Sequence, residues 1–110
     1  MTEVELHIFI NKGGKLLLNP ERIKLLRTIQ ETGSLLTASK QTGISYNKVW
    51  KILDAMNNTT NKNVIEKIRG GKGGGGAVVT EYGKLILEEY NAIEKAVDRF
   101  TKKLNVEIKL

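Results

Sequence analysis

Hydrophobic and polar positions alternate along the start of the chain as they do in β-strands. Apolar residues stand at positions 4, 6, 8 and 10, and Glu5, His7 and Phe9 separate them. A period of two predicts a strand. The run Asn11-Lys12-Gly13-Gly14 then predicts a turn, and residues 15–18 can return as a second strand.

A helical pattern follows this hairpin. Asn19-Pro20 marks a helix start, because Asn can cap a helix and Pro is tolerated at its first position. The helix should run to about residue 31, and Gly33 should end it.

Two shorter helices are predicted next, joined by a tight connection. Ser34 can cap a helix over residues 35–41, and Gly43 can adopt the positive φ that the connection requires. Ser45 can cap a third helix over residues 46–57, which should fray into a polar loop of Asn and Thr.

The second half of the chain predicts a β-hairpin and one long helix. Strands are expected over 64–69 and 77–79, and the helix over 81–104. The tail, residues 105–110, alternates weakly and is either a strand or disordered. This order predicts a winged helix-turn-helix, mainly α with small β-hairpins, in which residues 1–80 form the winged domain.

The third predicted helix has an apolar face and an opposite polar face. At 100° per residue, its apolar stripe consists of Val49, Ile52, Leu53 and Met56. The exposed N-terminal half presents Tyr46, Asn47, Lys48, Trp50 and Lys51. Asn and Lys side chains can bind base edges or phosphates from the major groove, so these residues are candidate DNA contacts. The alternative is an ordinary solvated face, with Tyr46 and Trp50 covering the hairpin.

Positive charge is concentrated in the same part of the chain. The net charge is +6, and residues 40–72 carry seven Lys or Arg against two acidic residues. A local basic block is typical of nucleic-acid binders, although solubility alone is the alternative.

The glycine-rich tip around Lys72 can lie against a sugar-phosphate backbone, or it is a loop without a ligand. A strand rather than a helix follows these glycines, which argues against a dinucleotide-binding motif.

The long helix carries a regular apolar seam. Its members are spaced by four and three residues in turn, as in a heptad repeat, and are Ile86, Tyr90, Ile93, Val97, Phe100 and Leu104. A seam of this length extends past one small domain, and a second copy of the helix is its simplest partner. We therefore expect a homodimer. The alternative is packing of the seam against the N-terminal strands of the same chain.

Composition argues against catalysis. The chain has no Cys and a single His, His7, so a catalytic triad or a zinc site is nearly impossible. The start of the chain lacks the features of a signal peptide, and no run approaches the roughly 18 apolar residues of a membrane span. We expect a cytoplasmic binding protein with no cofactor, no metal and no enzymatic activity.

Several motifs resemble the N-terminal domain of ModE-type molybdate-responsive regulators, which is itself similar to the winged helix of LysR-type regulators. These motifs are Gly33-Ser34, Ala38, Gly43 to Tyr46, Val49-Trp50, Met56-Asn57, Gly70 to Ala77, and Thr80 with Tyr82-Gly83. The resemblance implies a homodimer held through the long helix, with two winged domains on a palindromic operator.

By position, the resemblance also implies which residues bind DNA. Contacts from the recognition helix would be Ser45, Tyr46, Asn47, Lys48 and Lys51, and contacts from the wing would be Arg69 and Lys72. Members of this family continue into a molybdate-binding domain, whereas this sequence stops at Leu110. The expected function is therefore a dimeric regulator that binds specific double-stranded DNA without its own molybdate-binding domain. The alternative is a winged-helix module that binds a protein partner.

Overall fold

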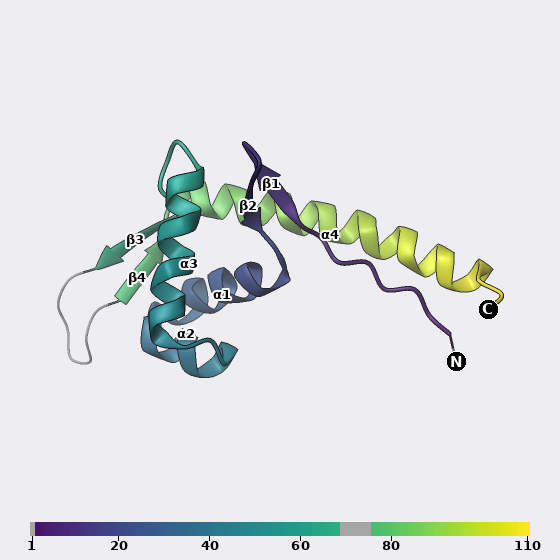
Figure 1. Cartoon of the computed structure of the whole chain (residues 1–110), viewed down its shortest axis with the longest axis horizontal. Coiled ribbons are helices and arrows are strands. Elements are labelled where there is room, and N and C mark those ends of the chain that lie inside the picture. Colours follow the sequence, from purple (N-terminus) through teal and green to yellow (C-terminus); the bar gives the residue numbers. More distant parts are fainter. Residues whose placement is uncertain (1, 69–75) are drawn as a thin grey trace.

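The fold was analysed in a computed structural model, in which residues 2–68 and 76–110 are described. The elements in chain order are β1 (Ile10–Lys12), β2 (Lys15–Leu18), α1 (Pro20–Thr32), α2 (Leu35–Thr42), α3 (Tyr46–Thr59), β3 (Ile65–Ile68), β4 (Gly76–Val79) and α4 (Glu81–Glu107). Strands β1 and β2 form one antiparallel hairpin, and β3 and β4 form the other. This is the expected winged helix-turn-helix, with β3 and β4 as the wing (Figure 1).

All four described helices begin at the predicted sites, and α1 and α2 also end at the predicted glycines, Gly33 and Gly43. The Asn19 side chain accepts a hydrogen bond from the Arg22 amide at 2.8 Å, and Pro20 occupies the first turn of α1. Gly33 ends α1 in the left-handed region, with φ 67°. Ser34 caps α2 in the same way that Asn19 caps α1.

One hydrophobic core joins α1, α2 and α3 to the hairpins. The apolar stripe of α3 is buried as predicted, and Val49 and Met56 are fully inaccessible to solvent. Leu25 and Leu35 bring the buried faces of α1 and α2 to the same core. The burial of these side chains is the main stabilising contribution to the domain.

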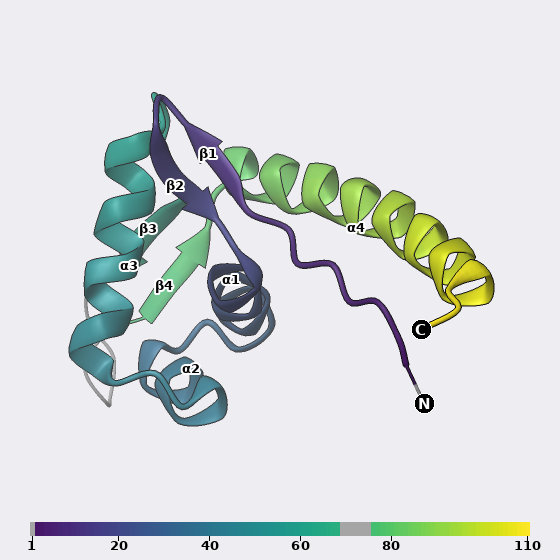
Figure 2. The same ribbon diagram turned by 45° about the vertical axis from the view of Figure 1, so that its right-hand side comes forward.

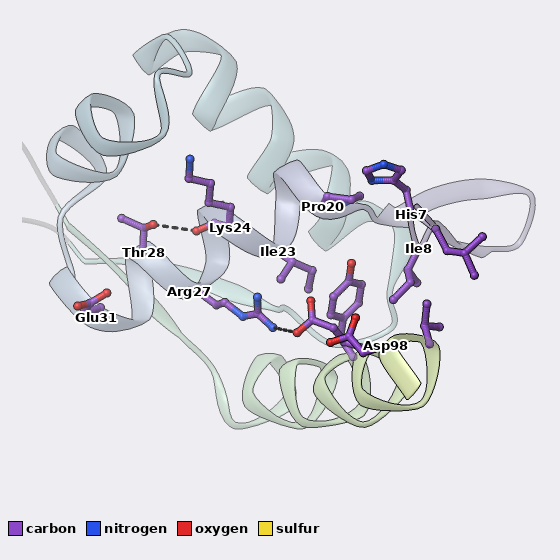
Figure 3. Close-up of a pocket in the computed structure, with 13 residues that line it drawn as sticks. His7, Ile8, Pro20, Ile23, Lys24, Arg27, Thr28, Glu31 and Asp98 are labelled. Atoms are coloured by element: carbon purple, nitrogen blue, oxygen red, sulfur yellow. Dashed lines mark hydrogen bonds and ion pairs between the residues drawn. The ribbon is translucent and has the colours of Figure 1, made fainter. Parts of the chain in front are cut away.

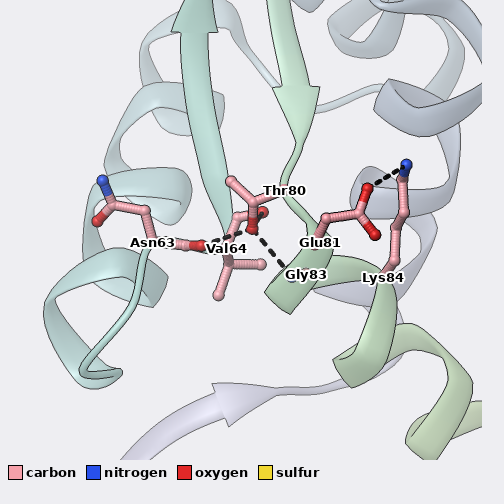
Figure 4. A network of polar contacts seen from close by, with 6 residues as sticks. All are labelled: Asn63, Val64, Thr80, Glu81, Gly83 and Lys84. Carbon is pink, nitrogen blue, oxygen red and sulfur yellow. Dashed lines mark hydrogen bonds and ion pairs between the residues drawn. The ribbon is translucent and has the colours of Figure 1, made fainter.

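The wing passes into α4 through a single residue, Thr80. Its amide donates to the Val64 carbonyl at 3.0 Å, and its hydroxyl donates to the Asn63 carbonyl at 2.6 Å (Figure 4). The same hydroxyl caps α4 by accepting from the Gly83 amide at 3.0 Å. Gly83 is required at this junction, because a Cβ there would overlap the Val64 carbonyl oxygen. The first turn of α4 is therefore held against residues 63–64, directly before β3.

The expected N-terminal strand is shorter than the alternation suggested. β1 begins only at Ile10, and residues 2–9 are extended but outside any strand. They run alongside α4 (Figure 2). The Asn105 side chain accepts from the Val4 amide and donates to the Val4 carbonyl. An extended segment beside a helix has no strand with which to form backbone hydrogen bonds. Here the Asn105 side-chain amide takes the place of such a strand at Val4.

The C-terminal tail is also different from the prediction. α4 continues to Glu107, so residues 105–107 are helical and do not form a separate tail. The Ile108 amide still donates to the Leu104 carbonyl at 2.9 Å. Neither Gly nor Pro interrupts residues 105–107, and none of the strands in the described part of the chain pairs with residues 106–110. The helix can therefore continue past Leu104.

Candidate nucleic-acid interface

The turn between α2 and α3 fixes the start of α3. Gly43 adopts φ 75°, and its amide donates to the Ser39 carbonyl at 3.0 Å. The Ser39 hydroxyl donates to the Ile44 carbonyl at 2.6 Å, and the Ile44 side chain is buried. Ser45 then caps α3 by accepting from the Lys48 amide at 3.2 Å. The position of α3 relative to α2 is therefore set by several local contacts.

The polar face of α3 is exposed as the sequence predicted. Asn47, Lys48 and Lys51 are all exposed, and Ser45 is exposed at the helix N-terminus. Lys51 has no ion pair within the described part of the chain, whereas Lys48 is paired with Glu21 of α1 at 3.5 Å. This face combines amide and ammonium groups at one helix N-terminus, which suits contacts to base edges and phosphates.

Trp50 joins α3 to the wing. Tyr46 and Trp50 meet edge to face, with ring centroids 6.1 Å apart. The Lys67 ammonium of β3 lies 4.0 Å from the centroid of the Trp50 ring, and 3.9 Å from the Asp54 carboxylate. Trp50 is half-buried against the core. The Trp50 ring therefore lies against the wing, which was the structural alternative to DNA contact. Lys67 gains a cation–π contact with this ring.

Asn57 makes a second connection between α3 and the wing. Its carbonyl oxygen accepts from the Val64 amide at 2.8 Å and the Ile65 amide at 3.2 Å. Its amide group donates to the Ile65 carbonyl at 2.9 Å. The prediction that the helix frays here was wrong, because α3 continues to Thr59. Neither Asn57 nor Lys67 has a local sequence signal for these contacts, which depend on the tertiary position of β3.

The base of the wing is held against the end of α1. The Ala77 amide donates to the Gly33 carbonyl at 3.3 Å. A Cβ on Gly76 would lie 2.6 Å from the same carbonyl oxygen, so only glycine permits this approach. Arg69 and Lys72, the expected wing contacts, lie outside the described residues. Of the described wing residues, Lys67 brings positive charge closest to α3.

The six residues of the α4 seam lie in two different environments. Tyr90 is buried, and burial is the main cause that raises the pKa of its phenol. Ile86, Val97 and Leu104 are half-buried. Ile93 and Phe100 are 38% and 56% exposed. The seam is therefore not a uniformly exposed surface: part of it is buried in the domain and part is open to solvent.

Part of the seam faces the N-terminal segment. Leu6, Ile8 and Val97 line a cleft between residues 2–9, α1 and α4 (Figure 3). In this cleft Arg27 donates to the Glu94 carboxylate at 3.1 Å. His7 lies on its rim, 3.6 Å from the exposed Glu5 carboxylate. The N-terminal segment, the alternative partner of the seam, thus lies across this cleft from part of the seam.

A second groove on α4 is mainly apolar and open. The first hairpin forms one wall and α4 the other, and its lining is Ile10, Leu17, Leu18, Tyr82, Leu85, Ile86, Glu89 and Ile93. Leu85 is 57% exposed in this groove. Exposed apolar side chains of this kind are typical of protein interfaces.

The described residues offer no group of His, Cys, Asp and Glu side chains that could hold a metal ion. Within the same residues, no helix is both long and apolar enough to cross a membrane.

Sequence comparison connects this geometry to known proteins. No protein-family model matches the chain. It is 36% identical over 100 residues to the transcriptional regulator ModE of Yersinia pestis, a match that covers 87% of this chain and 38% of that protein. The DNA-binding transcriptional dual regulator ModE of Escherichia coli K12 matches equally well. The molybdenum transport protein ModE of Azotobacter vinelandii is 37% identical over 92 residues, or 80% of this chain and 34% of that protein. The chain thus spans less than two-fifths of the length of these relatives.

Proposed function

The chain is homologous to the ModE transcriptional regulators over most of its own length, and from this premise we propose that it is a transcriptional regulator that binds specific double-stranded DNA. The observation that carries the proposal is the exposed N-terminal half of α3, fixed by the turn at Gly43 and flanked by the wing. Such a helix can enter the major groove while the wing follows the backbone.

The residues of this surface have different roles in the proposed complex. Asn47 reads a base edge, since an Asn side chain can pair bidentately with adenine. Lys51 binds phosphate, because it is exposed and has no ion pair among the described residues. Trp50 and Lys67 keep the wing beside α3. Arg69 and Lys72 remain proposed phosphate contacts on the basis of sequence alone.

We further propose that the protein acts as a homodimer through α4. Support comes from the exposed Ile93 and Phe100 in the seam, and from the open groove that contains Leu85. A two-fold dimer would present two α3 helices to half-sites one helical turn apart, about 34 Å, or a multiple of it. The protein is proposed to work in the cytoplasm as a binding protein without catalytic activity.

The proposed base contact is tested by replacing Asn47 with Ala. Duplexes selected from a random pool give the preferred site, and Kd is then measured on that site and on random duplex. We expect Asn47→Ala to cost about 1–3 kcal/mol on the preferred site and little on random DNA. Asn58→Ala is the matched control, because Asn58 is also exposed on α3 but lies at its far end.

The outcomes separate the two candidate functions. Equal losses on preferred and random DNA would show that Asn47 reads no base. A wild-type protein that binds no duplex at low salt would favour the alternative, a winged-helix module that binds a protein partner.

A further inference from the structure

Lys48 and Glu21 connect the N-termini of two helices on the proposed DNA-binding side. The Lys48 ammonium lies 3.5 Å from the Glu21 carboxylate, and both side chains remain about half exposed. Glu21 belongs to the first turn of α1, and Lys48 to the first turn of α3. The ion pair thus holds one of the expected DNA contacts toward α1.

The position of Lys48 explains why it needs an anion. A helix N-terminus carries partial positive charge, so a cation in the first turn of α3 is unfavourable unless a negative group lies near it. The Ser45 hydroxyl that caps α3 is neutral and accepts from the Lys48 backbone amide, so it supplies no negative charge to the Lys48 ammonium. A DNA phosphate at this helix terminus would supply the same charge that Glu21 supplies in the free protein.

We infer that Glu21 is a specificity-determining residue, which competes with DNA phosphates for Lys48; the inference rests on the proposed DNA binding. Random DNA is bound almost entirely through phosphates, so a lysine engaged elsewhere weakens this binding directly. On a preferred site, base contacts from Asn47 fix the register of α3, and a released Lys48 has less freedom to find a phosphate. Glu21 therefore weakens non-specific binding more than specific binding.

A purely structural role for Glu21 makes a different prediction. An acidic residue in the first turn of α1 also interacts favourably with the partial charge of that helix. If this were its whole role, replacing Glu21 would change the free energy of unfolding and leave the ratio of specific to random affinity unchanged.

The test uses the full chain with Glu21→Gln and a matched control, Glu31→Gln. Glu31 is exposed on the same helix, and it has no ion pair within the described residues. Both substitutions raise the net charge by one. We expect Glu21→Gln to tighten binding to random duplex about two- to fivefold, the range expected for one exposed ion pair, and to tighten preferred-site binding less. The salt slope on random DNA should become steeper by about one per protomer.

A double-mutant cycle then assigns the effect to the ion pair. On random duplex, the double variant Glu21→Gln/Lys48→Met should bind like Lys48→Met alone. Once the Lys48 ammonium is removed, Glu21 and the phosphates no longer compete for it. Thermal unfolding of each variant confirms that it is folded.

The results distinguish failure of the inference from failure of the proposed function. A wild-type protein without any sequence preference would overturn both. If the wild type discriminates between duplexes, three results overturn the inference alone. The first is a Glu21→Gln effect equal to that of Glu31→Gln. The second is a Glu21→Gln effect that persists on the Lys48→Met background. The third is a Glu21→Gln effect of the same size on the preferred site and on random duplex, which leaves the ratio of the two affinities unchanged.

Discussion

The two halves of α4 share one heptad pattern but have different surroundings. In the first half, Gly83, Leu87 and Tyr90 are buried in the winged domain. From residue 91 to residue 107 no side chain is buried, although the apolar seam continues. The comparison shows that a heptad pattern identifies the apolar face of a helix and leaves open what covers it. The first half contributes to the domain core, and the exposed seam of the second half, together with the groove at Leu85, is the surface proposed to bind a second copy.

The largest difference between the halves should appear in folding stability. Leu87 is only 4% exposed, so Leu87→Ala should lower the free energy of unfolding by about 2–5 kcal/mol through lost burial and a cavity. Val106, in the second half, is 86% exposed, and Val106→Ala should change stability by no more than about 0.5 kcal/mol. Urea denaturation followed by circular dichroism measures both. Equal losses would mean that the second half is as well packed as the first.

Self-association, unlike folding stability, should depend on the second half of α4 more than on the first. Phe100 is 56% exposed on the seam, and Phe100→Asp would place an unpaired charge in the proposed dimer interface. We expect the dimer to dissociate, and DNA affinity to fall by at least about tenfold because one half-site is lost. Sedimentation followed by titration on one duplex measures both effects.

Val106→Asp is the matched control for this substitution. It adds the same charge to an exposed apolar position of α4 that lies off the seam. A wild-type monomer in sedimentation, or dissociation caused equally by Val106→Asp, would contradict a dimer built on the seam.

The smallest expected effect concerns the N-terminal segment on the second half of α4. Asn105→Ala removes both hydrogen bonds to the Val4 backbone. Each such bond contributes about 0.5–1.5 kcal/mol, so cleavage by a glutamate-specific protease at Glu3 and Glu5 should accelerate about tenfold. Lys102→Ala, an exposed change on the same helix, is the control. Unchanged cleavage would show that Asn105 does not hold the segment.

Local signals in the sequence predict most of the elements and the exposed face of α3. Asn19, Ser34 and Ser45 each cap the helix that they were expected to cap, because capping needs only the residue and the next turn. The stripe of α3 is likewise a property of its own periodicity. These local features also indicate which α3 side chains are presented to a partner.

Features that depend on distant neighbours could not be predicted. The alternation over residues 4–10 indicates an extended backbone, but whether a strand or a helix lies beside it is a tertiary property. The same holds for Asn57, which the sequence alone assigns to a polar loop and which the position of β3 turns into a hydrogen-bonded contact. The ion pair of Glu21 with Lys48 joins residues from two separate helices, and no spacing rule connects them.

The single-residue passage at Thr80 has a mechanical consequence for the proposed dimer. With no loop to absorb a change in angle, the wing and α4 must turn together, and α4 acts as a lever about 40 Å long. A tilt of about 10° at the junction would displace its far end by about 7 Å, close to two base-pair steps of 3.4 Å. The packing of Gly83 against Val64 would therefore set the separation between the DNA half-sites that the proposed dimer can reach.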